Sequence, residues 1–130
     1  MGKVFKETVI CIVIVVVIFS LDLFTQGYTN KTTDEITGLF TELKNLAVEE
    51  NKSELENKIK ELDEKWNEKH DKLAYYIEHD ELEKVDTAIV SAKSYIQTDD
   101  YPSASAELDV GKFVLEHIKK KYAFNLVNVF

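Results

Sequence analysis

The sequence contains no arginine, and this absence limits the partners that the chain can bind. Arginine is the preferred bidentate donor to phosphate and carboxylate groups in proteins. The 130 residues instead carry 16 lysines against 24 aspartates and glutamates, which gives a formal net charge of −8 at pH 7. The acidic balance and the missing arginine argue against nucleic-acid binding. They also argue against docking of the charged part of the chain on anionic lipid.

Cysteine, glycine and proline are also scarce. The one cysteine, Cys11, lies in an apolar run, so the polar part of the chain has no disulfide and its fold must depend on packing. We interpret Cys11 as an inert apolar side chain, with palmitoylation as the alternative. Beyond residue 31, only Gly38, Pro102 and Gly111 could interrupt a regular element. This scarcity excludes a turn-rich β architecture, and the many Lys, Glu, Leu and Ala residues predict an all-α fold.

The motifs of common enzymes and metal sites are missing from the sequence. There is no glycine-rich phosphate loop, no Gly-x-Ser-x-Gly elbow, no His-Glu-x-x-His pair and no Glu-x-x-His motif. The carboxylates mostly form i, i+4 pairs with lysines, as Glu54 does with Lys58. We therefore expect no catalytic residue, no cofactor and no metal ligand. His79, Glu83 and Asp86 could line one helical face as a weak metal site; the competing interpretation is a solvated turn whose acidic side chains cap a helix.

What the chain does contain is one long apolar run near its start. Lys3 and Lys6 precede the run, which extends over residues 8–24 and is interrupted only by Asp22. At about 1.5 Å per residue the run spans roughly 25 Å, slightly less than a hydrocarbon core of about 30 Å. Its length and composition predict one membrane-spanning helix.

The lysines before this run predict its orientation. Lysine favours the cytoplasmic side of a membrane. We predict a signal-anchor in residues 1–25, a cytoplasmic N-terminus and a single-pass protein of the cell membrane whose remaining residues lie outside the cytoplasm. The competing interpretation is a cleaved signal peptide, but only a poor cleavage site, Thr25-x-Gly27, follows the run.

The rest of the chain has the periodicity of amphipathic helices. We predict a polar linker at residues 26–31, a helical domain at 32–124 and an apolar tail at 125–130. Apolar residues recur at spacings of three and four in four segments of the domain. The four sets are Ile36, Leu39, Phe40, Leu43, Leu46 and Ala47; Leu55, Ile59, Leu62, Trp66, Leu73 and Ile77; Leu82, Val85, Ile89, Ala92 and Ile96; and Ala104, Leu108, Gly111, Leu115 and Ile118. Short connections favour antiparallel neighbours, so we expect a four-helix antiparallel bundle or a pair of stacked helical hairpins.

Local signals predict where these helices begin. Thr33 or Asp34 is expected to be the N-cap of the first helix, and Ser53-x-x-Glu56 has the form of a capping box for the second. Each of these residues offers a side-chain oxygen to backbone N–H groups that have no partner at the start of a helix.

The two later boundaries have different signals. A break in the register of the apolar residues predicts a tight turn at residues 78–81, with a bent continuous helix as the alternative. Asp80-x-x-Glu83 offers a cap-like start for the third helix. The Asp-Asp-Tyr-Pro sequence at residues 99–102 predicts a stop and a restart, because proline is favoured in a first helical turn. Lysines at 119–121 suit the C-terminal end of the fourth helix.

Aromatic residues and the apolar tail are the remaining candidates for function. We interpret Trp66 and the tyrosines as core and core-edge packing, with a binding surface as the alternative. In the tail, Leu126, Val129 and Phe130 are candidate partner-binding residues. They either fold back onto the bundle and complete its core or add to a partner as an extended strand.

Several short features together resemble a known family. They are the N-terminal anchor, Trp66, the segments His79-Asp80-Glu81 and Val85-Asp86, and the end Asn128-Val129-Phe130. With these features the chain resembles the bacterial domain of unknown function 4363 family, whose members are small N-terminally anchored helical membrane proteins. The resemblance covers most of the chain, although Asp80 stands where glutamate is more often expected. Because the family has no established activity, the resemblance assigns no catalytic residue to this chain. It favours a membrane protein as the partner.

These observations lead to one functional expectation and one alternative. The expectation is a non-enzymatic, membrane-tethered, extracytoplasmic helical interaction module that binds another membrane or envelope protein. The alternative is a helical ligand- or metal-binding domain that presents cargo to a membrane partner. An envelope hydrolase is a weaker interpretation because the sequence offers no nucleophile and base together.

Overall fold

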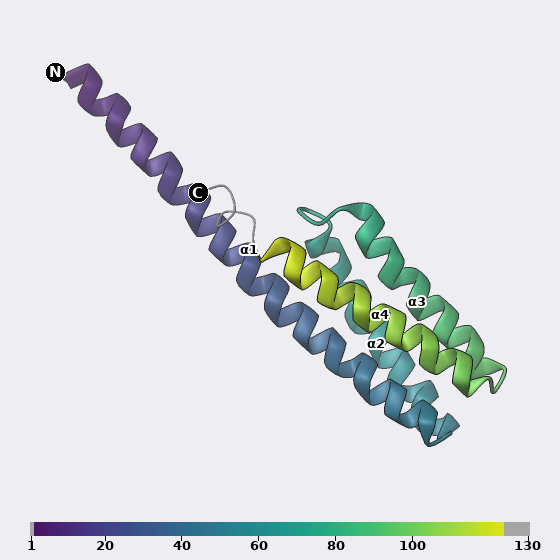
Figure 1. Ribbon diagram of the computed structural model, residues 1–130. Coiled ribbons are helices and arrows are strands. Elements are labelled where there is room, and N and C mark those ends of the chain that lie inside the picture. The colour runs from purple at the N-terminus through teal and green to yellow at the C-terminus, as the bar shows by residue number, and fades with distance from the viewer. Residues whose placement is uncertain (1, 124–130) are drawn as a thin grey trace.

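The computed structural model describes residues 2–123, and this part of the chain contains four α-helices and no strand. The helices are α1 (Gly2–Val48), α2 (Lys52–Leu73), α3 (His79–Gln97) and α4 (Tyr101–Tyr122). Figure 1 shows α2, α3 and α4 beside the second half of α1, while the first half of α1 projects from one end of this bundle. The predicted all-α class is confirmed, and so is the helical bundle.

The helices are ordered around the bundle as they are along the chain. Each helix contacts the next, and α4 returns to contact α1. The connections are short, at residues 49–51, 74–78 and 98–100. Consecutive helices therefore run in opposite directions, and the α2–α3 connection lies with the end of α4 where the first half of α1 projects (Figure 1). We call this the head end of the bundle and the opposite end the distal end.

The helix α1 runs without interruption from the apolar segment into the bundle. The predicted linker at residues 26–31 is helical, and the predicted helix start at Thr33 or Asp34 is wrong. The Thr29 hydroxyl donates to the Thr25 carbonyl, and the Thr33 hydroxyl donates to the Thr29 carbonyl, both at 2.7 Å. Because these hydroxyls are satisfied one turn back along the helix, they do not cap a new one. Both threonines are also buried, and such packing stabilises a helix where its intrinsic propensity is weak.

The starts of α2 and α4 are capped by acidic or amide side chains. The N-cap of α2 is Asn51, whose side chain accepts a hydrogen bond from the Glu54 N–H at 3.3 Å, so the predicted capping box at Ser53 is wrong. The start of α4 agrees with the prediction. The Asp100 side chain accepts a hydrogen bond from the Ser103 N–H at 3.2 Å, and Pro102 lies in the first turn of α4.

The break between α2 and α3 is confirmed, but it lies earlier than predicted. The α2 helix ends at Leu73, and the chain turns at residues 74–78 instead of 78–81. The N-cap of α3 is Glu78, which makes no side-chain capping bond, so the predicted cap at Asp80 is wrong. The register change lies between Ile77 and Leu82, but Ile77 already belongs to the turn; because it is buried all the same, the apolar pattern counts it as the last residue of the α2 stripe.

The distal end turns without glycine. Glu50 and Asp99 adopt positive φ angles of 56° and 59° after α1 and α3. Glycine commonly takes this conformation at the end of a helix because it has no Cβ. Lys52 pairs with Asp99 at 2.7 Å and joins the two distal connections. The hydrogen bond from Lys52 lowers the pKa of the Asp99 carboxyl.

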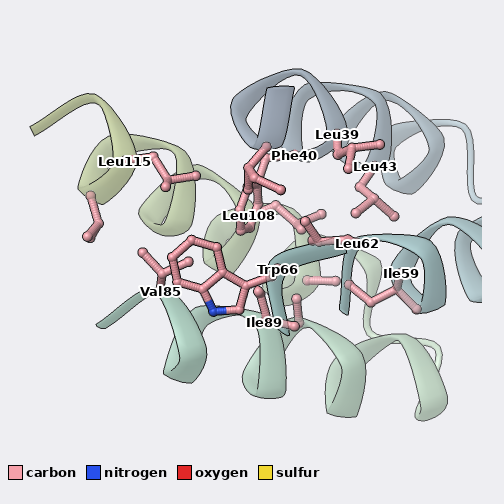
Figure 2. Packing of buried hydrophobic residues seen from close by; sticks show 14 of the residues in the cluster. Leu39, Phe40, Leu43, Ile59, Leu62, Trp66, Val85, Ile89, Leu108 and Leu115 are labelled. Carbon is pink, nitrogen blue, oxygen red and sulfur yellow. The ribbon is translucent and has the colours of Figure 1, made fainter. Parts of the chain in front are cut away.

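The core contains the predicted apolar stripes. All of their members are buried except Leu46, which packs partly buried against the core, and Val114 and Ala88 join them. Trp66, at 1% exposure, is the largest of the fully buried side chains. Figure 2 shows its indole ring in the middle of the cluster, near Val85 and Leu108. The interpretation of Trp66 as a core residue is confirmed.

Candidate functional site

The first candidate is the apolar half of α1, which projects from the bundle. Within residues 2–123, α1 is the one helix long and apolar enough to cross a membrane, and 0% of its apolar window is buried in the structure. The side chain of Phe24, the last residue of the run, is 72% exposed. Apolar surface left in water forgoes about 25 cal/mol per Å² relative to burial, so this segment needs an apolar environment. A membrane anchor and a signal sequence share this property.

The single acid within the apolar run has a partner on its polar side. Gln26 donates from its side-chain nitrogen to the Asp22 carboxylate at 2.7 Å. Since Gln26 lies one turn closer to the bundle, this bond directs the Asp22 carboxylate away from the middle of the apolar run. A charged group at the end of a spanning helix reaches toward the headgroups in the same way.

The head end of the bundle is built around tyrosines. The Tyr76 hydroxyl lies 2.7 Å from the Thr29 hydroxyl and 3.4 Å from the Thr25 carbonyl oxygen, to which it donates. The Tyr122 hydroxyl accepts from the Glu78 N–H at 2.9 Å. The rings of Tyr76 and Tyr122 meet edge to face, with their centroids 6.5 Å apart. These contacts hold the α2–α3 connection between α1 and the end of α4.

Two further tyrosines occupy the head end in different environments. The Tyr28 ring is partly buried against the core and lies 6.0 Å from the Lys69 ammonium. Tyr75, in the α2–α3 connection, is 89% exposed. Burial raises the pKa of the neighbouring Tyr76 hydroxyl, against the opposing effect of its hydrogen bond with Thr29. Tyr76 therefore stays protonated at neutral pH and acts as a structural contact.

A buried acid joins α3 to α4 at the head end. Glu81 is only 7% exposed, and one of its carboxylate oxygens lies 3.7 Å from the Lys121 ammonium and 3.9 Å from the His117 imidazole. Lys121 also pairs with Glu78 at 3.4 Å. The lysine therefore bridges two acids at the start of α3. The other carboxylate oxygen of Glu81 is buried without a hydrogen-bond partner among the described residues, and the apolar pattern carries no signal of this buried acid.

The weak metal site considered as an alternative at His79, Glu83 and Asp86 is not assembled in the structure. His79 and Glu83 are exposed, while Asp86 accepts a hydrogen bond from the Trp66 indole nitrogen and lies 3.3 Å from the His70 imidazole. Within residues 2–123, no three histidine, cysteine or acidic side chains come together as a metal site would require. Asp86 thus fixes the edge of the core, and His70 is half-buried beside the Trp66 ring.

An open groove lies between α3 and α4. Its volume is about 550 Å³, and its walls contain Asp80, Lys84 and Glu107 together with Val110 and other residues of the two helices. Its lining mixes both charges with aliphatic side chains. The three predicted partner-binding residues, Leu126, Val129 and Phe130, lie outside the described residues.

Fold and site together define a class of protein, an all-α bundle whose first helix continues into a long exposed apolar segment. The chain matches the family described as Domain of unknown function (DUF4363) over residues 23–129, and it belongs to that family. The resemblance seen in the sequence is confirmed. The matched region takes in the whole bundle and only the last residues of the apolar run. No curated protein matches the chain, and no solved structure matches it.

Proposed function

We propose that the chain is a non-enzymatic helical interaction module tethered to the cell membrane by one retained anchor. Its N-terminus faces the cytoplasm, and its bundle lies outside the cytoplasm and binds another membrane or envelope protein. One observation carries the proposal: the exposed apolar segment and the first bundle helix are one continuous helix.

A continuous helix has a different consequence from a flexible tether. A Gly/Ser-rich linker lets a domain explore many orientations. In α1 the rotation of the apolar segment fixes the rotation of the bundle, and the Tyr76 contacts with Thr25 and Thr29 reinforce this at the junction. A bundle held at fixed height and rotation suits recognition of a neighbour in the same membrane.

Orientation is supported by the charges on either side of the apolar run. Lys3 and Lys6 precede it, and positive charge before a spanning helix favours the cytoplasm. The bundle after the run carries the acidic excess of the chain, and acidic residues contribute little to the choice of orientation.

Single-cysteine labelling tests both the tether and its orientation, because Cys11 is the only natural cysteine. In a Cys11→Ala background, Asn57→Cys places a thiol on the exposed surface of α2, and Gly2→Cys is the matched variant before the anchor. A membrane-impermeant maleimide added to intact spheroplasts should label Asn57→Cys alone, and both variants after lysis. Labelling of Gly2→Cys in intact spheroplasts contradicts the orientation. Release of a shorter, soluble Asn57→Cys product contradicts a retained anchor.

The groove between α3 and α4 favours the second candidate, a ligand- or metal-binding domain that presents cargo to a membrane partner. Isolation of the full chain from native membranes separates the two functions. A stoichiometric membrane protein supports the interaction module, and a co-purifying small molecule or metal supports the second candidate. A metal site also predicts that chelator lowers the melting temperature, because a ligand that binds only the folded state stabilises it.

A further inference from the structure

We infer that the head end of the bundle is seated in the phospholipid headgroup layer and that Tyr75 contacts this layer. The inference rests on the proposed membrane anchor and adds an interaction surface on the bundle itself. The partner is the interface of the same bilayer that α1 crosses.

The position of α1 in the bilayer sets the height of the head end. A hydrocarbon core of about 30 Å takes about 20 helical residues, so the apolar run at residues 8–24 nearly fills it, with the charged side chains of Lys6 and Glu7 reaching back to the cytoplasmic headgroups. Thr25 then lies where the headgroup layer begins. That layer is about 5–7 Å thick, and at about 1.5 Å per residue the turn from Thr25 to Thr29 crosses it.

The α2–α3 connection is fixed at this same height. The Tyr76 hydroxyl contacts Thr29 at 2.7 Å and the Thr25 carbonyl at 3.4 Å, so it lies beside the turn that crosses the headgroup layer. On the other side, Tyr122 accepts from the Glu78 N–H and holds the connection against α4. Figure 1 shows the connection and the end of α4 beside the same part of α1. The bundle therefore meets the bilayer with no spacer.

Tyr75 has the exposure and the chemistry for this contact. At 89% exposure it is the most exposed of the large hydrophobic side chains among the described residues, including those of the apolar segment. Its neighbour Tyr76 is held by hydrogen bonds to α1, which fixes the backbone beside Tyr75. A tyrosine has an apolar ring and a polar tip, and it is enriched where hydrocarbon meets headgroups.

The charges near Tyr75 indicate which headgroups are needed. Asp71, Lys72 and Glu78 give this part of the chain both signs of charge. An acidic protein gains nothing from anionic lipid, whereas a tyrosine ring at the interface needs no lipid charge. We therefore commit to a zwitterionic phosphatidylcholine layer as sufficient.

Tryptophan fluorescence in a bilayer tests this contact. The full-length Tyr75→Trp variant is reconstituted into phosphatidylcholine nanodiscs with and without a nitroxide on the lipid headgroup. Tyr95→Trp is the control at the opposite end of the bundle. Tyr95 is also at the surface, at 36% exposure, but it lies about 24 Å beyond the start of α3, near the distal end. The wild-type protein, whose single tryptophan is buried Trp66, measures how much of the quenching comes from Trp66 alone.

The nitroxide lipid should reduce the added emission of Tyr75→Trp about twofold or more, because probe and residue share a layer about 5–7 Å thick. The emission of Tyr95→Trp and of the wild type should change little. If Tyr75→Trp is quenched no more than Tyr95→Trp while the protein stays in the nanodisc, the headgroup contact is refuted and the anchor stands. If the protein is not retained by the nanodisc, the proposed anchor itself is refuted. Equal thermal melts of both variants confirm that neither change disturbs the bundle.

Discussion

Gly111 marks a close approach of three helices, and adding a single methyl group there tests this packing. A Cβ built on Gly111 of α4 would lie 2.5 Å and 2.7 Å from two ring carbons of Phe40 in α1, and 3.3 Å from the Cβ of Ala88 in α3. Carbon atoms in contact are normally about 3.5–4.0 Å apart. The Gly111→Ala methyl therefore overlaps the Phe40 ring by about 1 Å, judged against that contact distance.

The two effects of the substitution oppose each other. Alanine in place of glycine stabilises a helix interior by about 1 kcal/mol. Forcing an extra carbon into a packed core costs about 1–3 kcal/mol. The Phe40 ring is 1% exposed and cannot swing into solvent, so the overlap should decide the sign. We expect a net loss of up to about 2 kcal/mol, which lowers the melting temperature by up to about 8–16 °C, at about 4–8 °C per kcal/mol for a domain of this size.

Gly38 is the matched control, because it is a helical glycine whose added Cβ would have nothing within 4 Å. Gly38→Ala should raise the stability by about 0.4–1 kcal/mol. Thermal unfolding of the full chain in detergent, followed by circular dichroism, compares the two variants under one condition. Gly111→Ala should cost less in a Phe40→Leu background, because the smaller side chain vacates the contact. If Gly111→Ala stabilises as much as Gly38→Ala, the close packing of α4 on α1 is wrong.

Three further predictions concern the core, the head end and the tail. Trp66→Ala should lower the free energy of unfolding by about 3–5 kcal/mol, and a loss below about 1 kcal/mol in the same melts would contradict its buried position. Burial raises the pKa of Tyr76, so its contribution to stability is complete below the ordinary tyrosine pKa of about 10 and is lost as the pH rises through the folded-state pKa. Melting temperatures should accordingly fall more for the wild type than for Tyr76→Phe above about pH 10; equal declines would contradict this role. Deletion of residues 125–130 should lower the melting temperature if the tail packs on the bundle, or abolish partner capture without affecting stability if the tail binds the partner; no change in either refutes both.

The amphipathic helices could be predicted because their signal is local and repeated. Each stripe places an apolar side chain on the same face every three or four residues, and burial of that face is what stabilises the helix. Leu108 and Ile118, for example, are ten residues apart on one face of α4, and both are buried. The start of α4 was predictable for the same reason, since Asp100 and Pro102 act within one turn.

The continuity of α1 could not be predicted from local signals. Threonine is common at helix caps and in polar linkers, so Thr29 and Thr33 do not predict a helix interior. Their burial and their hydrogen bonds to carbonyls one turn back accompany the helical conformation seen in α1. That burial comes from contacts far away in the chain, such as Tyr76 on Thr29, which are 47 residues apart. Periodicity carries no information on such pairs.

The same limit explains why the sequence did not indicate the contacts of the candidate site. The pairing of Glu81 with Lys121, and that of Trp66 with Asp86, depend on which helices become neighbours and at what height. A weak metal site at His79 was only an alternative to a solvated turn, and in the structure this residue is exposed, with no cluster of metal ligands among residues 2–123. Aromatic residues at the head end were visible in the sequence, but only the antiparallel order of the helices brings them together.

Continuity of α1 makes a final prediction about the proposed partner. Each residue added to a helix rotates the rest of the chain by about 100° and moves it by about 1.5 Å. Two alanines inserted between Phe24 and Thr25 would turn the bundle by about 200°, whereas four would turn it by about 400°, which leaves it only about 40° from its original face. The insertions leave the Tyr76 contacts of the head end in place, because Thr25, Thr29 and Tyr76 all lie on the bundle side of the insertion point.

Partner capture from native membranes should therefore be lost with two inserted alanines and largely kept with four. The longer insertion raises the bundle by about 6 Å and the shorter by about 3 Å, so a requirement for height alone predicts the opposite order. Equal capture by both variants would show that the apolar segment and the bundle act as independent parts joined by a flexible tether. In that case the continuous helix carries no information about the partner, and the proposal of a fixed recognition face is wrong.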